Sequence, residues 1–349
     1  MRNDTRQKFT AYLERLAQLN GVASATQQFT AAPSTQQTLE AKLQESSEFL
    51  KLINMIGVDQ QSGEKIHPDV SSPVAGRTNT DTDGVRQPRS MGAAQGQGYF
   101  CRQTDFDTGI KYATLDAWAR FPDFQIRVRD AVLKRQALDR IMIGFNGRTA
   151  AATTNRQANP LLQDVNIGWL QKIRTDAPTH VMDGGAESEN AIYVDEGGNA
   201  DYDSLDQLVF DAHATLIAEW FQEDPQIVAI VGRSLMSDKL FPLASGANAP
   251  TEQLAAQVLR SQRRLGGLQA ITAPFMPPDA VLITSLSNLS VYWQIGTRRR
   301  YIKDEPEKNR IANYESVNED YVVEDYDRCA LIENIVLGPV PAEEPEGGQ

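Results

Sequence analysis

The sequence contains few of the residues from which catalytic and metal sites are built. Among its 349 residues there are two cysteines, Cys101 and Cys329, and three histidines, His67, His180 and His213. Two cysteines cannot hold a metal cluster, and we expect both to be reduced and packed in the interior. The histidines lie far apart without the spacing of metal ligands, so a three-histidine zinc site is only a formal alternative. We therefore predict no metal site.

The motifs of nucleotide-binding and hydrolytic enzymes are also absent. Residues 227–240, IVAIVGRSLMSDKL, follow the order strand, glycine turn and helix, but they contain neither GxxxxGK[ST] nor GxGxxG. No GxSxG motif occurs. The acidic residues between 315 and 327 lack EF-hand spacing, which favours a solvated or salt-bridged strand edge over a cation site. We predict no catalytic residue and no cofactor, and hence no enzyme.

The chain also lacks long apolar runs and an excess of positive charge. No run is long enough to span a bilayer, and the N-terminal MRNDTRQKF has no apolar segment of the secretory kind. We therefore expect a protein that is made in the cytoplasm and has no membrane contact. The formal net charge of −12 argues against a protein whose function is to bind nucleic acid tightly.

The longest helical pattern runs from Ala119 to Gly147. Its apolar residues recur at steps of three and four, which predicts an amphipathic helix of about six turns, with Pro122 at the first helical position. The opposite face is basic and carries Arg127, Arg129 and Arg140. This face either lies in solvent and forms ion pairs on the helix surface, or it contacts an acidic neighbouring subunit.

Two helices joined by a polar segment are predicted at the N-terminus. Residues 3–20 have helical periodicity, whereas residues 24–38, SATQQFTAAPSTQQT, have none and read as an exposed linker open to proteolysis. A second helix is predicted at residues 38–53. The apolar stripe of the first helix contains Phe9, Leu13 and Leu16, and we expect it to meet a scaffold or a neighbouring subunit.

Composition and periodicity predict the structure of three further regions. Residues 57–110 are poor in large apolar side chains, which indicates a projecting two-stranded loop that must be stabilised by docking on another chain. Residues 161–295 predict a compact α/β domain with helices at 161–174 and 204–221 and a buried strand at 227–231. Residues 298–337 are strand-like.

Arg298, Arg299 and Arg300 open this last region. They could contact a phosphate, or they could pair with carboxylates of a neighbouring subunit, and we favour the pairing. The candidate carboxylates are Glu315, Glu319, Glu324 and Asp325.

Six collinear segments resemble the major capsid proteins of P2-type tailed phages, which have the HK97-type fold. They are RQKFTAYLERLAQLNGV at 6–22, LQESSEFLKLIN at 43–54, YATLDAWARFPDFQIRVRDAVLKRQALDRIMIGFNG at 112–147, LQDVNIGWLQKIR at 162–174, EDPQIVAIVGR at 223–233 and NYESVNEDYVVEDY at 313–326.

This resemblance implies an α+β, HK97-like capsid fold with a defined domain plan. The plan comprises a cleaved N-terminal assembly segment at 1–33, an N-terminal arm at 34–56, an extended loop (E-loop) at 57–110, a peripheral domain with the long spine helix at 111–160, an axial domain at 161–297, the C-terminal strands of the peripheral domain at 298–340, and a disordered tail at 341–349.

The resemblance also implies a function and a set of partners. The chain would be a major capsid protein, assembled in the host cytoplasm into the pentamers and hexamers of an icosahedral virion head enclosing double-stranded DNA. Its partners would be an internal scaffolding protein, a maturation protease that cuts between Phe29 and Thr30, and a portal. The alternatives are a phage- or prophage-encoded α/β accessory protein or enzyme, and an encapsulin-like compartment shell.

Overall fold

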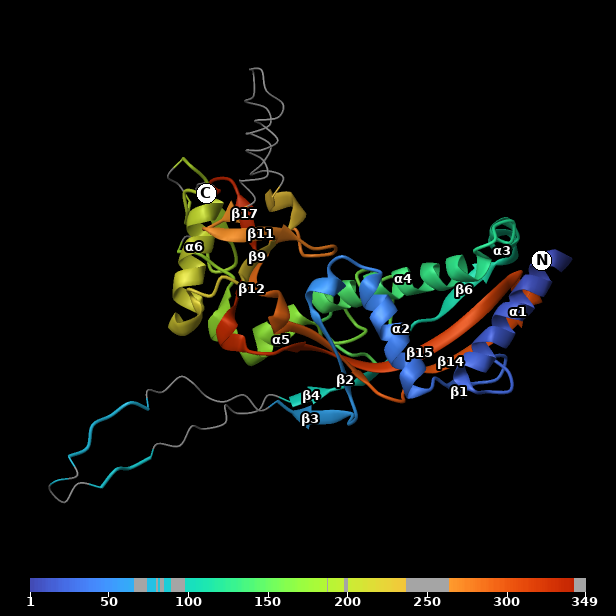
Figure 1. The fold of residues 1–349 in the computed structure, drawn as a ribbon. Helices are drawn as coiled ribbons and strands as arrows, with labels where there is room; N and C mark the ends of the chain where they lie inside the picture. Colours follow the sequence, from blue (N-terminus) through green and yellow to red (C-terminus); the bar gives the residue numbers. More distant parts are fainter. Residues whose placement is uncertain are drawn as a thin grey trace, which may run out of the picture.

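The computed structural model of the chain describes residues 1–65, 74–79, 81, 85–88, 98–186, 188–197, 200–236 and 264–341. It shows an elongated part built along the longest strand, a compact part around a second sheet, and a thin loop that leaves the body (Figure 1). Helices and sheets are combined as the α+β class requires. His67 and residues 342–349 of the tail predicted at 341–349 lie outside the described residues.

The predicted long helix is present as α4, Phe124–Asn146. It begins at Phe124, so the expectation that Pro122 is the first helical residue is wrong; Asp123 is at the N-cap position but makes no side-chain capping hydrogen bond. Its first turns pack against α1, Asn3–Asn20, and its later turns lie in the main apolar core. The helix therefore links the N-terminal helix to the centre of the molecule.

The elongated part is a seven-stranded sheet around β15, Arg310–Val323. The strand order is β1-β14-β15-β13-β2, and β5 and β6 pair with the other edge of β15. The pairing is antiparallel except between β13 and β2. Its other members are β1 Phe29–Thr30, β2 Asn54–Val58, β5 Arg102–Asp105, β6 Thr108–Lys111, β13 Leu289–Gln294 and β14 Arg299–Glu305.

The compact part is a six-stranded sheet in the order β10-β11-β9-β12-β16-β7. The predicted buried strand is β9, Ile227–Val231, with every residue buried. Alternate residues of β9 face opposite layers: Ala229 packs with helix α6, Leu205–Leu216, and Ile230 packs with α5, Trp169–Asp176. The remaining strands are β7 Val181–Met182, β10 Arg264–Leu265, β11 Leu268–Thr272, β12 Val281–Ser285 and β16 Cys329–Ile332, and a separate pair joins β8 Ile192–Val194 to β17 Ile335–Leu337.

The two sheets exchange strands across the expected domain boundary at residue 297. β13, which precedes the boundary, belongs to the seven-stranded sheet, whereas β16, which follows it, pairs with β12 in the six-stranded sheet. The chain passes between the seven-stranded and the six-stranded sheet more often than the periodicity of the sequence indicates.

Three predicted helices have different bounds. The first, expected at 38–53, is α2, Pro33–Glu45, because Pro33 is favourable in the first helical turn, and a short 3-10 turn follows at Leu50–Leu52. The second, expected at 161–174, is only α5, since Leu162 has φ +59° and interrupts the helical backbone. The third, expected at 204–221, ends with α6 at Leu216.

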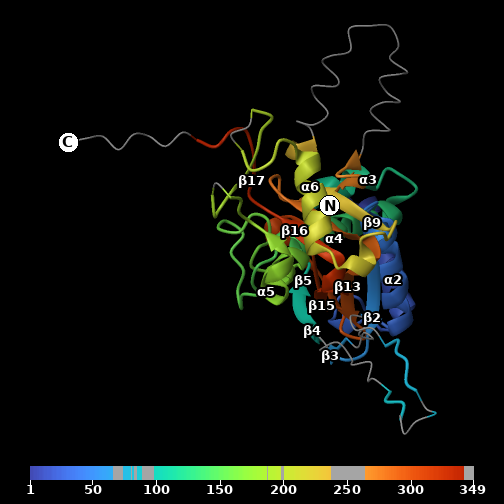
Figure 2. The same ribbon diagram turned by 90° about the vertical axis from the view of Figure 1, so that its left-hand side faces the viewer.

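The extended loop leaves the body through a short ladder between β3, Ser62–Glu64, and β4, Gly98–Phe100. Figure 2 shows its described residues, in cyan, lying apart from both sheets. Its described residues, at 74–79, 81 and 85–88, are all exposed. In the part of the chain that the structure describes, no helix is long and apolar enough to cross a membrane.

Candidate assembly and processing site

The expected cleavage bond lies in β1, at the edge of the seven-stranded sheet. Phe29 pairs with Arg300 and Thr30 with Arg299, and the N–H of Ala31 donates to the Arg298 carbonyl at 2.8 Å. The Phe29 side chain is buried and that of Thr30 is exposed. The expectation of an exposed, structureless linker is wrong here, because this segment completes a sheet edge. Cleavage at this bond stays a prediction.

The apolar stripe of α1 packs on its own chain. Phe9 is buried in a cluster with Leu115, Phe124 and Ile302, and Leu13 and Leu16 are partly buried against the same cluster. The expectation that this stripe faces another chain is therefore wrong for Phe9. The physical reason is that α3, Tyr112–Trp118, α4 and β14 already present buried apolar side chains to this helix.

Polar contacts at the surface complete the attachment of α1. The Arg2 N–H donates to Asp116 Oδ1 at 2.9 Å, and the Arg6 guanidinium pairs with Asp304 at 3.2 Å. Both contacts are solvent-exposed, and exposed pairs of this kind contribute about 0–1 kcal/mol. Burial of apolar side chains is thus what holds α1 on the body.

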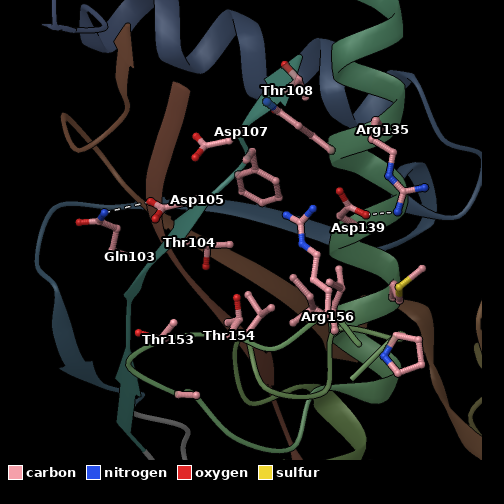
Figure 3. A pocket seen from close by; sticks show the side chains of 18 of the residues that line it. Gln103, Thr104, Asp105, Asp107, Thr108, Arg135, Asp139, Thr153, Thr154 and Arg156 are labelled. Carbon is pink, nitrogen blue, oxygen red and sulfur yellow. Dashed lines mark hydrogen bonds and ion pairs between the residues drawn. The ribbon is translucent and has the colours of Figure 1, made fainter. Parts of the chain in front are cut away.

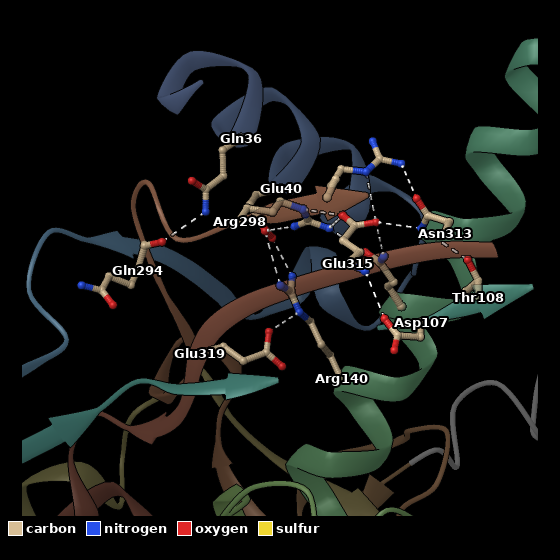
Figure 4. Close-up of polar contacts among 12 residues, drawn as sticks. Gln36, Glu40, Asp107, Thr108, Arg140, Gln294, Arg298, Asn313, Glu315 and Glu319 are labelled. Atoms are coloured by element: carbon tan, nitrogen blue, oxygen red, sulfur yellow. Dashed lines mark hydrogen bonds and ion pairs between the residues drawn. The ribbon is translucent and has the colours of Figure 1, made fainter. Parts of the chain in front are cut away.

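A buried cluster of charges lies beside β1 and joins α2, α4, β14 and β15 (Figure 4). Glu40 of α2 accepts from Arg140 of α4 at 2.6 Å and also from Arg298. Arg140 Nε donates to Glu319 at 2.8 Å, and Arg298 Nε donates to Glu315 at 2.6 Å. With Arg300, which lies 3.5 Å from Glu315, the cluster contains three carboxylates and three guanidinium groups.

Neutral side chains take up the remaining hydrogen-bonding groups of this cluster. Gln136 accepts from Arg298 at 2.7 Å and donates to Glu315 at 3.0 Å, and the Tyr321 hydroxyl donates to Glu319 at 3.0 Å. The balance of charge and these hydrogen bonds offset the cost of burying the charged groups, although Arg300 Nε, 3.5 Å from Glu315, has no hydrogen-bond partner among the described residues.

The pKa values of the carboxyl groups reflect this competition. Burial raises the pKa of Glu315, but Arg298 and Arg300 outweigh burial and lower it to about 2. Burial opposes the arginines at Glu40 as well, and Arg140 and Arg298 again lower the pKa. At Glu319 burial prevails and raises the pKa, although Arg140 opposes it.

Three residues expected at a subunit interface therefore lie inside the chain. Arg298, Glu315 and Glu319 are buried and neutralise one another or their neighbours, which overturns the expectation that they face another subunit. Arg140, expected on the basic solvated face of the long helix, is fully buried. One signal could have revealed it, since Arg140 lies at helical spacing from the buried Ala137 and Gly144.

The other candidate interface residues lie nearer the surface. Arg127 is exposed and Arg129 is partly buried, and each pairs with a local carboxylate, at 2.8 Å to Asp123 and 2.7 Å to Asp130. Arg299 is exposed on β14. Glu324 accepts from the Tyr292 hydroxyl at 3.1 Å, and Asp325 caps a 3-10 turn by accepting from the Asp327 N–H. Their role between subunits stays a prediction.

A polar pocket of about 570 Å³ lies between β5, β6, α4 and the segment that follows α4 (Figure 3). Asp139 pairs with Arg135 at its wall, and Asp107 accepts from the Glu315 N–H at 3.2 Å. The Thr104 hydroxyl is buried without a hydrogen-bond partner among the described residues. The charged side chains of the pocket whose ion pairs or hydrogen bonds are described contact other groups of the protein. We therefore assign no catalytic reaction to the pocket.

The two thiols are structural. Burial raises the pKa of Cys101 to about 12 and raises that of Cys329 further, so neither is ionised at neutral pH. Among the residues that the structure describes, no three histidine, cysteine or acidic side chains are grouped to hold a metal ion.

Comparisons with known proteins place this architecture in a class. A chain of a solved structure described as a satellite phage P4 procapsid including size determination (Sid) protein matches 97% of this chain and 99% of its own length, with a TM-score of 0.78 and 46% sequence identity. The capsid proteins of Escherichia phage P2 are 48% identical over 345 residues, covering 97% of this chain and 96% of theirs. The major capsid protein of Serratia phage KSP20 is 42% identical and covers both chains completely. The fold is thus a phage capsid fold, and the HK97-type class expected from the sequence is confirmed.

The chain belongs to the P2 family of phage major capsid proteins, whose sequence model matches residues 8–335. The resemblance stated from the sequence and the function that it implied, major capsid protein of a phage head, are confirmed. The protein is a structural component of the virion, and the accessory-enzyme and compartment-shell alternatives are not favoured.

Proposed function

We propose that copies of this chain form the hexamers and pentamers of an icosahedral head around double-stranded DNA. An internal scaffolding protein directs assembly, a portal admits the DNA, and a maturation protease removes residues 1–29. In this proposal residues 34–56 are the arm, 57–110 the extended loop, and 111–160 and most of 298–340 the peripheral domain. The axial domain contains the six-stranded sheet, including β16.

The extended loop is the observation that carries this proposal. Its base is a ladder of three residue pairs, and two of its apolar side chains, Val74 and Val85, are 60% and 75% exposed. Burying a valine stabilises by about 1.5 kcal/mol or more, so a loop that leaves such side chains in water gains by docking elsewhere. The symmetry of a ring of subunits supplies a binding surface for the loop, because every copy in the ring has the same neighbouring subunit.

Replacing the loop by a short turn tests its role in assembly. Glu64 and Gly98 are paired across the ladder, so a glycine-containing turn can replace residues 66–97 while keeping Lys65, which donates to the Val323 carbonyl. We expect a subunit with an unchanged melting temperature that forms no closed shells in negative stain. Normal shells from this variant would remove the assembly role, and a much lower melting temperature would show that the loop stabilises its own subunit.

The second part of the proposal is removal of the N-terminal segment. β1 contributes only two residues to an edge of the sheet, so few backbone hydrogen bonds oppose its release. The solved procapsid of the structural relative supports assembly through an immature shell. Intact-mass measurement on mature particles should give a chain that begins at Thr30. Full-length chains throughout would refute processing, whereas a cut elsewhere in 24–38 would correct only the site.

The charge of the chain fits the enclosure of DNA. A net charge of −12 disfavours strong contact with phosphates, so DNA can be packed without being condensed on the wall.

A further inference from the structure

An apolar groove of about 510 Å³ runs between α1, α2 and α4. Two large side chains in it face solvent, since Leu19 of α1 is 53% exposed and Ile126 of α4 is 49% exposed. Side chains from all three helices form the rest of its apolar lining, namely Tyr12, Leu16, Leu39, Val132 and Leu133. A groove of this kind between helices suits the apolar face of a further helix.

The edges of this groove are basic. Arg15 comes from α1, Lys42 from α2 and Arg129 from α4, and Arg300 lies deeper beside Glu315, the one carboxylate in the lining. Four cationic side chains thus meet a single carboxylate in a chain whose net charge is −12. The pairs that Lys42 and Arg129 form with local carboxylates are exposed, so a partner can exchange them at little cost.

We propose that this groove binds an acidic amphipathic helix of a separate assembly protein. Leucine-sized side chains of the partner would lie between Leu19 and Ile126, and its carboxylates would meet Arg15, Lys42 and Arg129. The charge complementarity selects this partner over a basic one and speeds their encounter. This inference rests on the proposed function, which requires that an assembly protein bind the immature subunit.

Processing would dismantle this site. Tyr12, Arg15, Leu16 and Leu19 form one wall, and all belong to the segment that cleavage after Phe29 would remove. The other two walls stay, because α2 and α4 are joined by the Glu40 cluster. The groove therefore binds its partner in the unprocessed subunit and loses it on maturation.

Site-specific photocrosslinking tests this inference on the full chain. A benzoylphenylalanine at Ile126 is compared with one at Phe210, which is 63% exposed on α6, in cells that make all the late proteins of the phage. We expect position 126 of unprocessed shells to crosslink to an acidic amphipathic segment of another protein, identified by mass spectrometry, and position 210 not to do so. The yield at position 126 should fall about tenfold or more in particles that lack residues 1–29, the change expected for a loss of about 1.4 kcal/mol in binding.

Charge reversal within the groove supplies the matched comparison. The double change Lys42→Glu and Arg129→Glu should lower the yield at position 126 several-fold, whereas Arg127→Glu, on the same helix but outside the groove lining, should not. A crosslink to a second copy of this chain, to a basic segment, or to nothing overturns the inference. Imaging of the same particles separates the two claims, since closed shells without the crosslink reject only the groove, and absence of shells from the unmodified chain rejects the proposed function.

Discussion

Replacing Glu40 by glutamine tests whether the buried charges hold α2 on the body. The substitution keeps the size of the side chain and removes the negative charge that faces Arg140 and Arg298. Three guanidinium groups would then share two carboxylates, Glu315 and Glu319, in a region closed to solvent. The expected result is a large loss of stability.

The structure indicates the size of that loss. Removing one partner of a buried ion pair costs about 3–5 kcal/mol, because the remaining charge is left without compensation. Arg140 keeps Glu319 and Arg298 keeps Glu315, and the glutamine carbonyl still accepts one hydrogen bond. We therefore expect a value near the lower end, about 3 kcal/mol, which is a large part of the stability of a typical domain.

Urea unfolding of the unassembled subunit measures this loss. With a denaturant slope of about 3 kcal/mol per M, a loss of about 3 kcal/mol lowers the midpoint by about 1 M. Glu48→Gln is the matched control, because Glu48 pairs with Lys51 at 2.7 Å while its side chain is 93% exposed. That change should cost at most about 1 kcal/mol. Equal effects of the two substitutions would falsify the claim that the cluster contributes to stability.

Two further predictions follow from the same packing. Because the pKa of Glu315 is lowered to about 2, its ionised carboxylate stabilises the folded state by about 3 kcal/mol above about pH 4.5. This stabilisation is lost as the pH falls from there to pH 2. The free energy of unfolding of Glu315→Gln should therefore vary less with pH over that range. Gly144→Ala should destabilise by about 1–3 kcal/mol or more, since the new Cβ would lie 2.2 Å from the Trp169 ring, whereas Gly76→Ala, in open space, should not change the melting temperature. Equal pH profiles, or equal melting of the two alanine variants, would contradict these predictions.

The elements with strong local periodicity could be predicted from the sequence. The stripe of α4 and the continuous apolar run of β9 have the lengths that a long half-buried helix and a buried strand require. The strand β15 lies within residues 298–337, which are expected to be strand-like. In each case the residues that decide the structure are near one another in the chain.

The charge cluster could not be predicted because its partners are far apart in sequence. Arg298 and Glu40 are 258 residues apart, and Arg140 and Glu319 are 179 apart. An arginine on an amphipathic helix normally lies in water, so Arg140 is expected at the surface despite its helical spacing from Ala137 and Gly144. The same limitation explains β1, whose few residues acquire structure only because β14 offers a free edge.

The two N-terminal helices are held to the body by different kinds of interaction, and the proposed cleavage falls between them. α2 is fixed by the buried Glu40 cluster and by Gln36, which accepts from the Gly296 N–H at 2.8 Å and donates to the Gln294 carbonyl. α1 is held by the buried apolar cluster around Phe9 and by exposed polar contacts. A cut after Phe29 would therefore release a helix that contributes no charge to the buried cluster, and every charged member of that cluster would remain in place. Under the proposed function, this arrangement lets one segment act during assembly and be removed afterwards without unfolding the subunit that forms the shell.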